Sequence, residues 1–82
     1  MNAQQENLAE ELVNRDFVYV EEVDAAVMYE KDTREGNETV TIFKNQNLAL
    51  HERWNKNGVL TSDNRYNTNL SAEMTRLLSS CH

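Results

Sequence analysis

Residues 38–54 read ETVTIFKNQNLALHERW, two runs of alternating apolar and polar residues separated by Asn45-Gln46-Asn47. Strict alternation is typical of β-strands, because successive side chains of a strand point to opposite faces of the sheet. Two strands joined by such a short polar turn pair in antiparallel fashion. The stretch therefore predicts a hairpin, formed by a strand over 38–44 and a second strand that begins at Leu48.

Strand-like segments flank this hairpin on both sides. Residues 25–31 form one of them, and Asp32 to Asn37 separate it from Glu38, with Gly36-Asn37 expected at the turn. On the other side, residues 55–58 read NKNG, an Asn-Gly hairpin signal before a short strand that starts at Val59 and extends to about Tyr66. The sequence thus predicts an antiparallel meander of about four short strands.

One face of the predicted third strand holds Leu48, Leu50, Glu52 and Trp54, and the other holds Ala49, His51 and Arg53. Because the larger apolar side chains share the first face, we expect that face to be largely core, with Trp54 covered or partly covered. Upstream, residues 17–20 read FVYV and are strand-like, whereas the acidic step 21–24, EEVD, is expected to interrupt them.

Two helices are predicted, one before the strands and one after them in the sequence. Residues 3–14 place Leu8 and Leu12 one turn apart, and Asn2 with Gln5 fits a capping box. The second helix is indicated by apolar residues at i, i+4, i+7 and i+8, namely Leu70, Met74, Leu77 and Leu78, with Thr68 or Asn69 as its cap. Both apolar stripes are expected to cover one sheet face, which makes residues 1–82 a single α+β domain.

The size and composition of the chain limit its class. With 82 residues there is room for one modest core, so self-association into a homodimer would help stability. No apolar run is long enough to span a bilayer, and we expect a cytoplasmic protein without a membrane partner. Cys81 is the single cysteine, so it can form a disulfide only between chains and suits a reducing compartment.

Charge is distributed unevenly along the chain. Residues 1–38 hold 11 acids and three bases, whereas residues 39–82 hold three acids and five bases. An acidic half repels phosphate and attracts basic protein surfaces, although acids can also serve only to keep a small domain soluble. The acids expected to bind a partner lie on the first predicted strand and around it: Glu21, Glu22, Asp24, Glu30, Asp32 and Glu35.

Residues for catalysis are scarce. A nucleophilic triad needs a histidine beside a hydroxyl or thiol, and the two histidines are His51, inside a predicted strand, and His82. Cys81, His82 and His51 could supply three metal ligands, but a rigid metal site is not expected at the last residues of the sequence. The two glycines, Gly36 and Gly58, are explained by turns and form no phosphate loop. We therefore expect a non-catalytic protein without a cofactor or metal.

A nucleic-acid-binding sheet is the alternative function. Single-stranded nucleic acids bind to sheets on which aromatic rings stack with bases and cations contact phosphates. Around the third and fourth predicted strands the chain offers two aromatic and three basic residues: Arg53, Trp54, Lys56, Arg65 and Tyr66. The number of such residues is low for this class of protein.

Residues 65–71 read RYNTNLS and connect the last predicted strand to the last helix. This order resembles small phage-encoded proteins of unassigned function, in which a tyrosine and a Thr/Ser-rich step precede the last helix. Asn69 and Leu70 stand where those proteins usually have Thr-Thr, and the resemblance covers at most the last third of the chain. It implies a phage or mobile-element origin. Together with the acidic half, it suggests an anti-defence inhibitor, similar to anti-CRISPR proteins, that binds a basic nucleic-acid-binding protein of the host.

Overall fold

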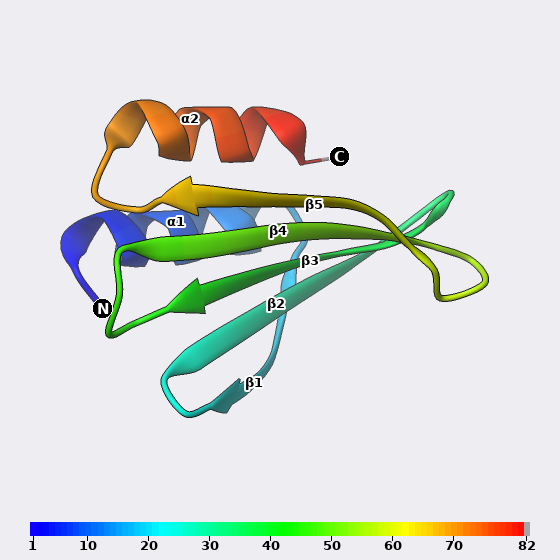
Figure 1. The fold of residues 1–82 in the computed structure, drawn as a ribbon, viewed down its shortest axis with the longest axis horizontal. Helices are drawn as coiled ribbons and strands as arrows, with labels where there is room; N and C mark the ends of the chain where they lie inside the picture. Colours follow the sequence, from blue (N-terminus) through cyan, green and yellow to red (C-terminus); the bar gives the residue numbers. More distant parts are fainter. Residues whose placement is uncertain (82) are drawn as a thin grey trace.

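The computed structural model describes residues 1–81, which form one five-stranded sheet and two helices (Figure 1). In chain order the elements are α1 (Ala3–Asn14), β1 (Val18–Val23), β2 (Ala26–Thr33), β3 (Gly36–Phe43), β4 (Leu48–Asn55), β5 (Leu60–Asn67) and α2 (Ser71–Ser80). Each strand pairs antiparallel with the next one in the chain. No helix among the described residues is long and apolar enough to cross a membrane. The predicted α+β meander with both helices on one sheet face is confirmed.

The sheet has one strand more than predicted. Glu21 and Glu22 were expected to interrupt the strand, but they continue β1 to Val23, so this prediction was wrong. The strand tolerates them because β1 is an outer strand and all six of its residues are exposed. A bulge between Tyr19 and Glu21 shifts the register, and the turn to β2 is formed by Asp24 and Ala25, both with positive φ.

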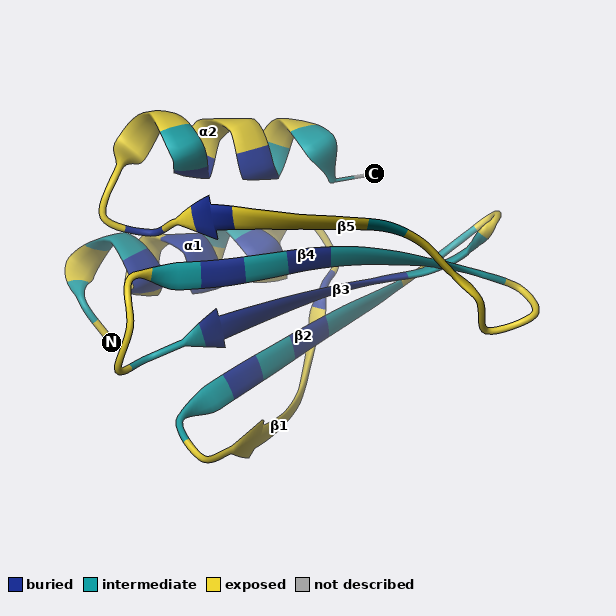
Figure 2. Ribbon diagram, in the orientation of Figure 1, coloured by how far each residue is buried: buried dark blue, intermediate teal, exposed yellow. Residues whose placement is uncertain are grey.

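The core lies between the sheet and the helices. The helices contribute Leu8, Leu12, Met74 and Leu77, and the sheet contributes Val27, Tyr29, Val40, Ile42, Ala49 and Tyr66. The face predicted to be core was therefore the wrong one, because Ala49 and His51 are buried while Leu48, Leu50 and Trp54 stay half-buried on the other face. The helices supply long side chains, so the small side chain of Ala49 suffices beneath them. Figure 2 shows β3 largely buried and β1 exposed.

Gln5 joins α1 to two distant segments. The predicted capping box is present, with Gln5 N donating to Asn2 Oδ1 at 2.8 Å and Asn2 N donating to Gln5 Oε1 at 3.2 Å. The side chain of Gln5 is fully buried, and its Nε2 lies within hydrogen-bond distance of the oxygens of Phe43, Gln46 and Thr68. Thr68 is thus an internal partner of Gln5 and does not cap α2.

The start of α2 and the β2–β3 turn also differ from prediction. The residue that precedes α2 is Leu70, which provides no side-chain cap. The β2–β3 turn is formed by Arg34 and Glu35, and Gly36 is the first residue of β3. A Cβ on Gly36 would lie 1.9 Å from the carbonyl oxygen of Trp54. Gly36 is therefore required by the close approach of β3 and β4, not by the turn.

Candidate protein-binding surface

The two helices cover one face of the sheet, and no element of the described chain covers the other, which we call the open face (Figure 1). Residues paired across an antiparallel sheet share a face, so the register assigns each side chain to one of the two faces. The centre of the open face is apolar and consists of half-buried side chains: Met28, Phe43, Leu48, Leu50 and Trp54. Around this centre the open face is mainly acidic.

A row of carboxylates crosses the open face. Glu30 pairs with Thr39, Thr39 with Glu52, and Glu52 with Asp63, so these side chains lie side by side on four neighbouring strands. Strands are about 4.8 Å apart, which places Glu52 and Asp63 in direct opposition. None of the three acids forms an ion pair with another described residue, and Glu30 only accepts a hydrogen bond from Asn37. The row therefore keeps its negative charge.

The opposition of Glu52 and Asp63 affects their titration. Partial burial raises the pKa of the Glu52 carboxyl, and the nearby charge of Asp63 raises it further. Both effects disfavour the ionised form of Glu52, so the folded chain is less stable with this charge than without it. A cation placed beside the two carboxylates would remove this repulsion.

Trp54 lies next to this row. Its indole Nε1 donates a hydrogen bond to Thr39 Oγ1 at 3.3 Å, and Thr39 stands between Glu30 and Glu52 in the row. The bond orients the half-exposed ring beside the acids. Arginine and lysine side chains bind to the faces of tryptophan rings. Carboxylates and an indole side by side are therefore well suited to basic side chains of a partner.

The acids predicted to bind a partner do not all lie together. Glu21, Glu30 and Asp32 point to the open face. Glu22 lies on the helix side of β1 and pairs with Lys44, whose Nζ is 2.9 Å from its carboxylate. Asp24 and Glu35 lie in the turns at opposite ends of β2.

Glu52 and Asp63 are not among the acids predicted to bind a partner, because they lie in the weakly basic half of the chain. A signal was present, since both flank the Asn-Gly turn at residues 55–58. Their opposition nevertheless depends on a register irregularity at Arg53 and Trp54, which alternation alone does not reveal.

The residues of the alternative nucleic-acid site are divided between the faces. Trp54 and Arg65 lie on the open face, whereas Arg53 and Tyr66 lie on the covered face. Tyr66 is buried beneath α2, with the guanidinium of Arg76 5.4 Å from its ring centre. Lys56 lies in the β4–β5 turn. Only two of the five residues therefore share the open face, and they lie apart on it, since Arg65 pairs with Leu50, four residues before Trp54 on β4.

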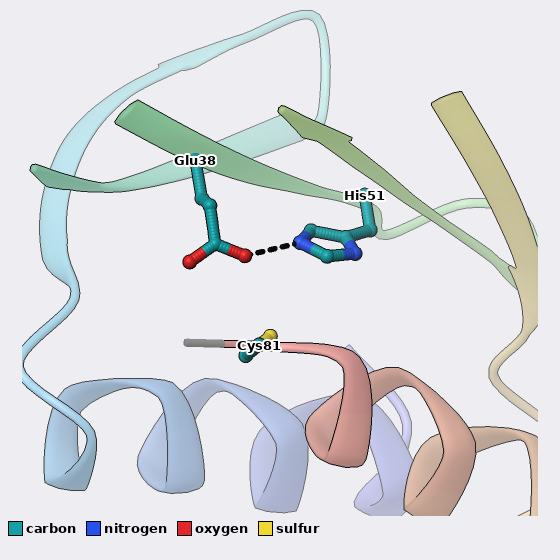
Figure 3. Close-up of side chains that lie close together, drawn as sticks. All are labelled: Glu38, His51 and Cys81. Atoms are coloured by element: carbon teal, nitrogen blue, oxygen red, sulfur yellow. Dashed lines mark hydrogen bonds and ion pairs between the residues drawn. The ribbon is translucent and has the colours of Figure 1, made fainter. Parts of the chain in front are cut away.

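A second cluster lies on the covered face. Glu38 and His51 are each 1% exposed, and His51 Nε2 lies 2.8 Å from Glu38 Oε1. Arg53 Nε also approaches Glu38 Oε1, at 3.3 Å, and Cys81 lies beside the pair (Figure 3). The structure therefore brings His51 and Cys81 together and adds Glu38, while His82 lies outside the described residues.

The thiol of Cys81 is a poor nucleophile in this environment. Burial and then the Glu38 carboxylate raise its pKa to about 11, against the opposing effect of Arg15, Arg53 and Lys31. The thiolate is the nucleophilic form of cysteine, and a pKa this high leaves almost none of it at neutral pH. The cluster therefore does not resemble an activated cysteine–histidine pair.

The outer edge of β1 adjoins the open face. Four exposed apolar side chains lie on this strand: Val18 (66%), Tyr19 (54%), Val20 (44%) and Val23 (55%). An open groove follows β1 and β2 and is lined by Asp16, Val18, Val20, Glu30, Lys31 and Asp32. An outer strand has backbone groups that can pair with another strand, so the edge and the open face form one continuous candidate surface. No protein-family model, curated protein or solved structure matches this chain.

Proposed function

We propose that this chain is a non-catalytic binding protein that docks on a basic surface of another protein through the open face and the β1 edge. The observation that carries this proposal is the row formed by Glu30, Glu52 and Asp63, none of which forms an ion pair with a described residue. Like charges opposed on a sheet destabilise the fold. Cations supplied by a partner convert this repulsion into attraction on binding.

The partner's basic side chains lie between the carboxylates and the indole of Trp54, where charge attraction and cation–π contact act together. An extended segment of the partner pairs with β1, and its basic side chains reach Glu30 and Asp32 along the groove. The exposed apolar residues of β1 supply the contact area that charge alone lacks.

The class of partner proposed here is a nucleic-acid-binding protein. Such proteins present arginine and lysine side chains in a groove that receives phosphates. A row of carboxylates on a rigid sheet offers that groove a substitute for the phosphates. Such a substitute for phosphates supports the anti-defence role expected from the sequence, in which the chain inhibits a host protein by occupying its nucleic-acid site.

A test compares two variants that remove the same number of charges. Glu52→Gln with Asp63→Asn, the row variant, neutralises two of the three acids of the row, whereas Glu6→Gln with Glu10→Gln neutralises two exposed acids of α1. Binding to an arginine-rich, strand-forming peptide is measured by calorimetry at low salt. Each partly exposed ion pair contributes up to about 1 kcal/mol, so the row variant is expected to bind about tenfold more weakly. The α1 variant should change by less than about twofold.

Equal losses in both variants would show that the peptide responds only to net charge, and the open face would then have no special role. Affinity should also fall as salt rises, because the contacts are electrostatic and partly exposed. Capture from a bacterial lysate with the wild-type chain and the row variant then identifies the partner. A specific partner is one that the wild-type chain retains and the row variant loses.

A further inference from the structure

Glu38, His51 and Cys81 form a cluster that the proposed binding surface does not use. Glu38 and His51 project from β3 and β4 toward the helices, and Cys81 follows the end of α2 beside them (Figure 3). One ligand atom from each residue lies within 4.8 Å of the other two. Carboxylate oxygen, imidazole nitrogen and cysteine sulfur are the three donor types that bind Zn²⁺ in proteins.

The imidazole of His51 presents Nε2 to the cluster. An ionised carboxylate only accepts hydrogen bonds, so His51 Nε2 donates to Glu38 Oε1, 2.8 Å away. A metal ion can replace this shared proton when the ring proton moves to Nδ1, because the lone pair of Nε2 then faces the ion. His51 is 1% exposed, and Nδ1 has no hydrogen-bond partner among the described residues. Protonation of Nδ1 therefore breaks no existing hydrogen bond.

The geometry points to a Zn²⁺ site formed by Glu38, His51 and Cys81, with a fourth position left for water. Ligand atoms on a tetrahedral Zn²⁺ ion are about 3.2–3.7 Å apart, so the cluster must contract by up to about 1 Å. Cys81 can provide this movement, because it is partly exposed and follows the last residue of α2. On binding, the bond from sulfur to its proton breaks, a zinc–sulfur bond forms, and the proton passes to solvent.

The cations around the cluster limit its affinity for a metal ion. The register places Glu38 between Lys31 and Arg53 on neighbouring strands, and Arg53 Nε lies 3.3 Å from Glu38 Oε1. Positive charges this close repel Zn²⁺. Replacing Arg53 with glutamine keeps an N–H donor but removes the charge. This variant should therefore bind Zn²⁺ at least about threefold more tightly than the wild-type chain.

The test is a Zn²⁺ titration of the reduced, metal-free chain, followed by calorimetry. The wild-type chain should bind one ion, and Cys81→Ser and His51→Gln should each weaken binding at least about tenfold. Glutamine retains an amide donor for Glu38 and lacks the imidazole nitrogen that would bind the ion. His82→Ala is the matched control, because it leaves the cluster intact but removes a neighbour of Cys81 that could chelate metal with it. Co²⁺ added instead of Zn²⁺ should show sulfur-to-metal charge-transfer absorption in the wild-type chain and not in Cys81→Ser.

Three results would overturn the proposal: no saturable binding to the wild-type chain, unchanged binding in Cys81→Ser, or binding lost in His82→Ala, which would assign the metal to the last two residues. Circular dichroism establishes whether each variant folds. If His51→Gln fails to fold, Cys81→Ser and Arg53→Gln decide. Weaker Zn²⁺ binding by Cys81→Ser together with tighter binding by Arg53→Gln supports the cluster, and any other pattern contradicts it.

Discussion

The carboxylates on the two faces of the sheet differ in whether the chain supplies partners for them. On the covered face, Glu38 is 1% exposed and lies within hydrogen-bond distance of His51 and Arg53. On the open face, Glu52 and Asp63 oppose each other and pair with no described cation. A buried charge is energetically costly unless the chain supplies a partner for it, whereas a charge in contact with solvent can remain unpaired. Unpaired acids on a half-buried, partly apolar face are thus available to another molecule.

The largest loss of stability is expected when the Glu38 carboxylate on the covered face is removed. Glu38→Ala leaves His51 and Arg53 without their carboxylate, and loss of one partner of a buried pair costs about 3–5 kcal/mol. The measurement is guanidinium-induced unfolding of the metal-free chain, followed by circular dichroism. In the control, Glu38→Leu with His51→Leu replaces the pair by apolar side chains and should recover much of the loss. A cost below about 1 kcal/mol in Glu38→Ala would show that the pair is not essential to the covered face.

A smaller loss is expected from Gln5→Ala, also on the helix side. The substitution removes the Nε2 donor shared by the carbonyl oxygens of Phe43 and Gln46 and the hydroxyl of Thr68, and it breaks the capping box. We expect the free energy of unfolding to fall by about 2 kcal/mol. Gln4→Ala, one residue earlier on the same helix, is the control and should change stability by less than about 0.5 kcal/mol. Similar effects of both substitutions would contradict the role given to Gln5.

The smallest effect, and the opposite sign, is expected on the open face. Glu52→Gln removes the repulsion with Asp63 and should stabilise the chain by about 0.5 kcal/mol near neutral pH. The pKa of Glu52 is raised in the folded chain, so the folded chain keeps this proton to higher pH than the unfolded chain does. The ionised carboxylate therefore lowers stability progressively as pH rises above the ordinary value of 4.5.

Unfolding curves of the wild-type chain and Glu52→Gln should therefore converge at about pH 4 and separate toward pH 7. Asp63→Asn should give a similar gain, and the double variant should gain less than the sum of the two, because either substitution alone removes the repulsion. A difference that is the same at every pH would rule out charge as its cause.

The elements of the fold could be predicted because their patterns are local. Alternation identified the strands around residues 38–54, and the spacing of Leu8 with Leu12 and of Met74 with Leu77 identified the helices. The capping box at Asn2 and Gln5 was also readable, since both partners lie within one turn.

Features that depend on tertiary contacts could not be read from local patterns. Apolar size suggested that Leu48 and Leu50 face the core, but Ala49 and His51 lie beneath the helices, because helix side chains fill that space. The candidate binding surface depends on register in the same way. Glu52 and Asp63 become neighbours only through the pairing of β4 with β5, and Glu38 joins His51 and Cys81 only through packing of α2 on the sheet.

The bulge between Tyr19 and Glu21 has a consequence for concentrated solutions. An outer strand with four exposed apolar side chains is a template for edge-to-edge aggregation. The bulge interrupts regular pairing partway along the strand, and Glu21, which forms no ion pair with a described residue, places like charges where two copies would meet. Association of two copies through this edge is therefore opposed by two independent features, an irregular backbone and a negative charge.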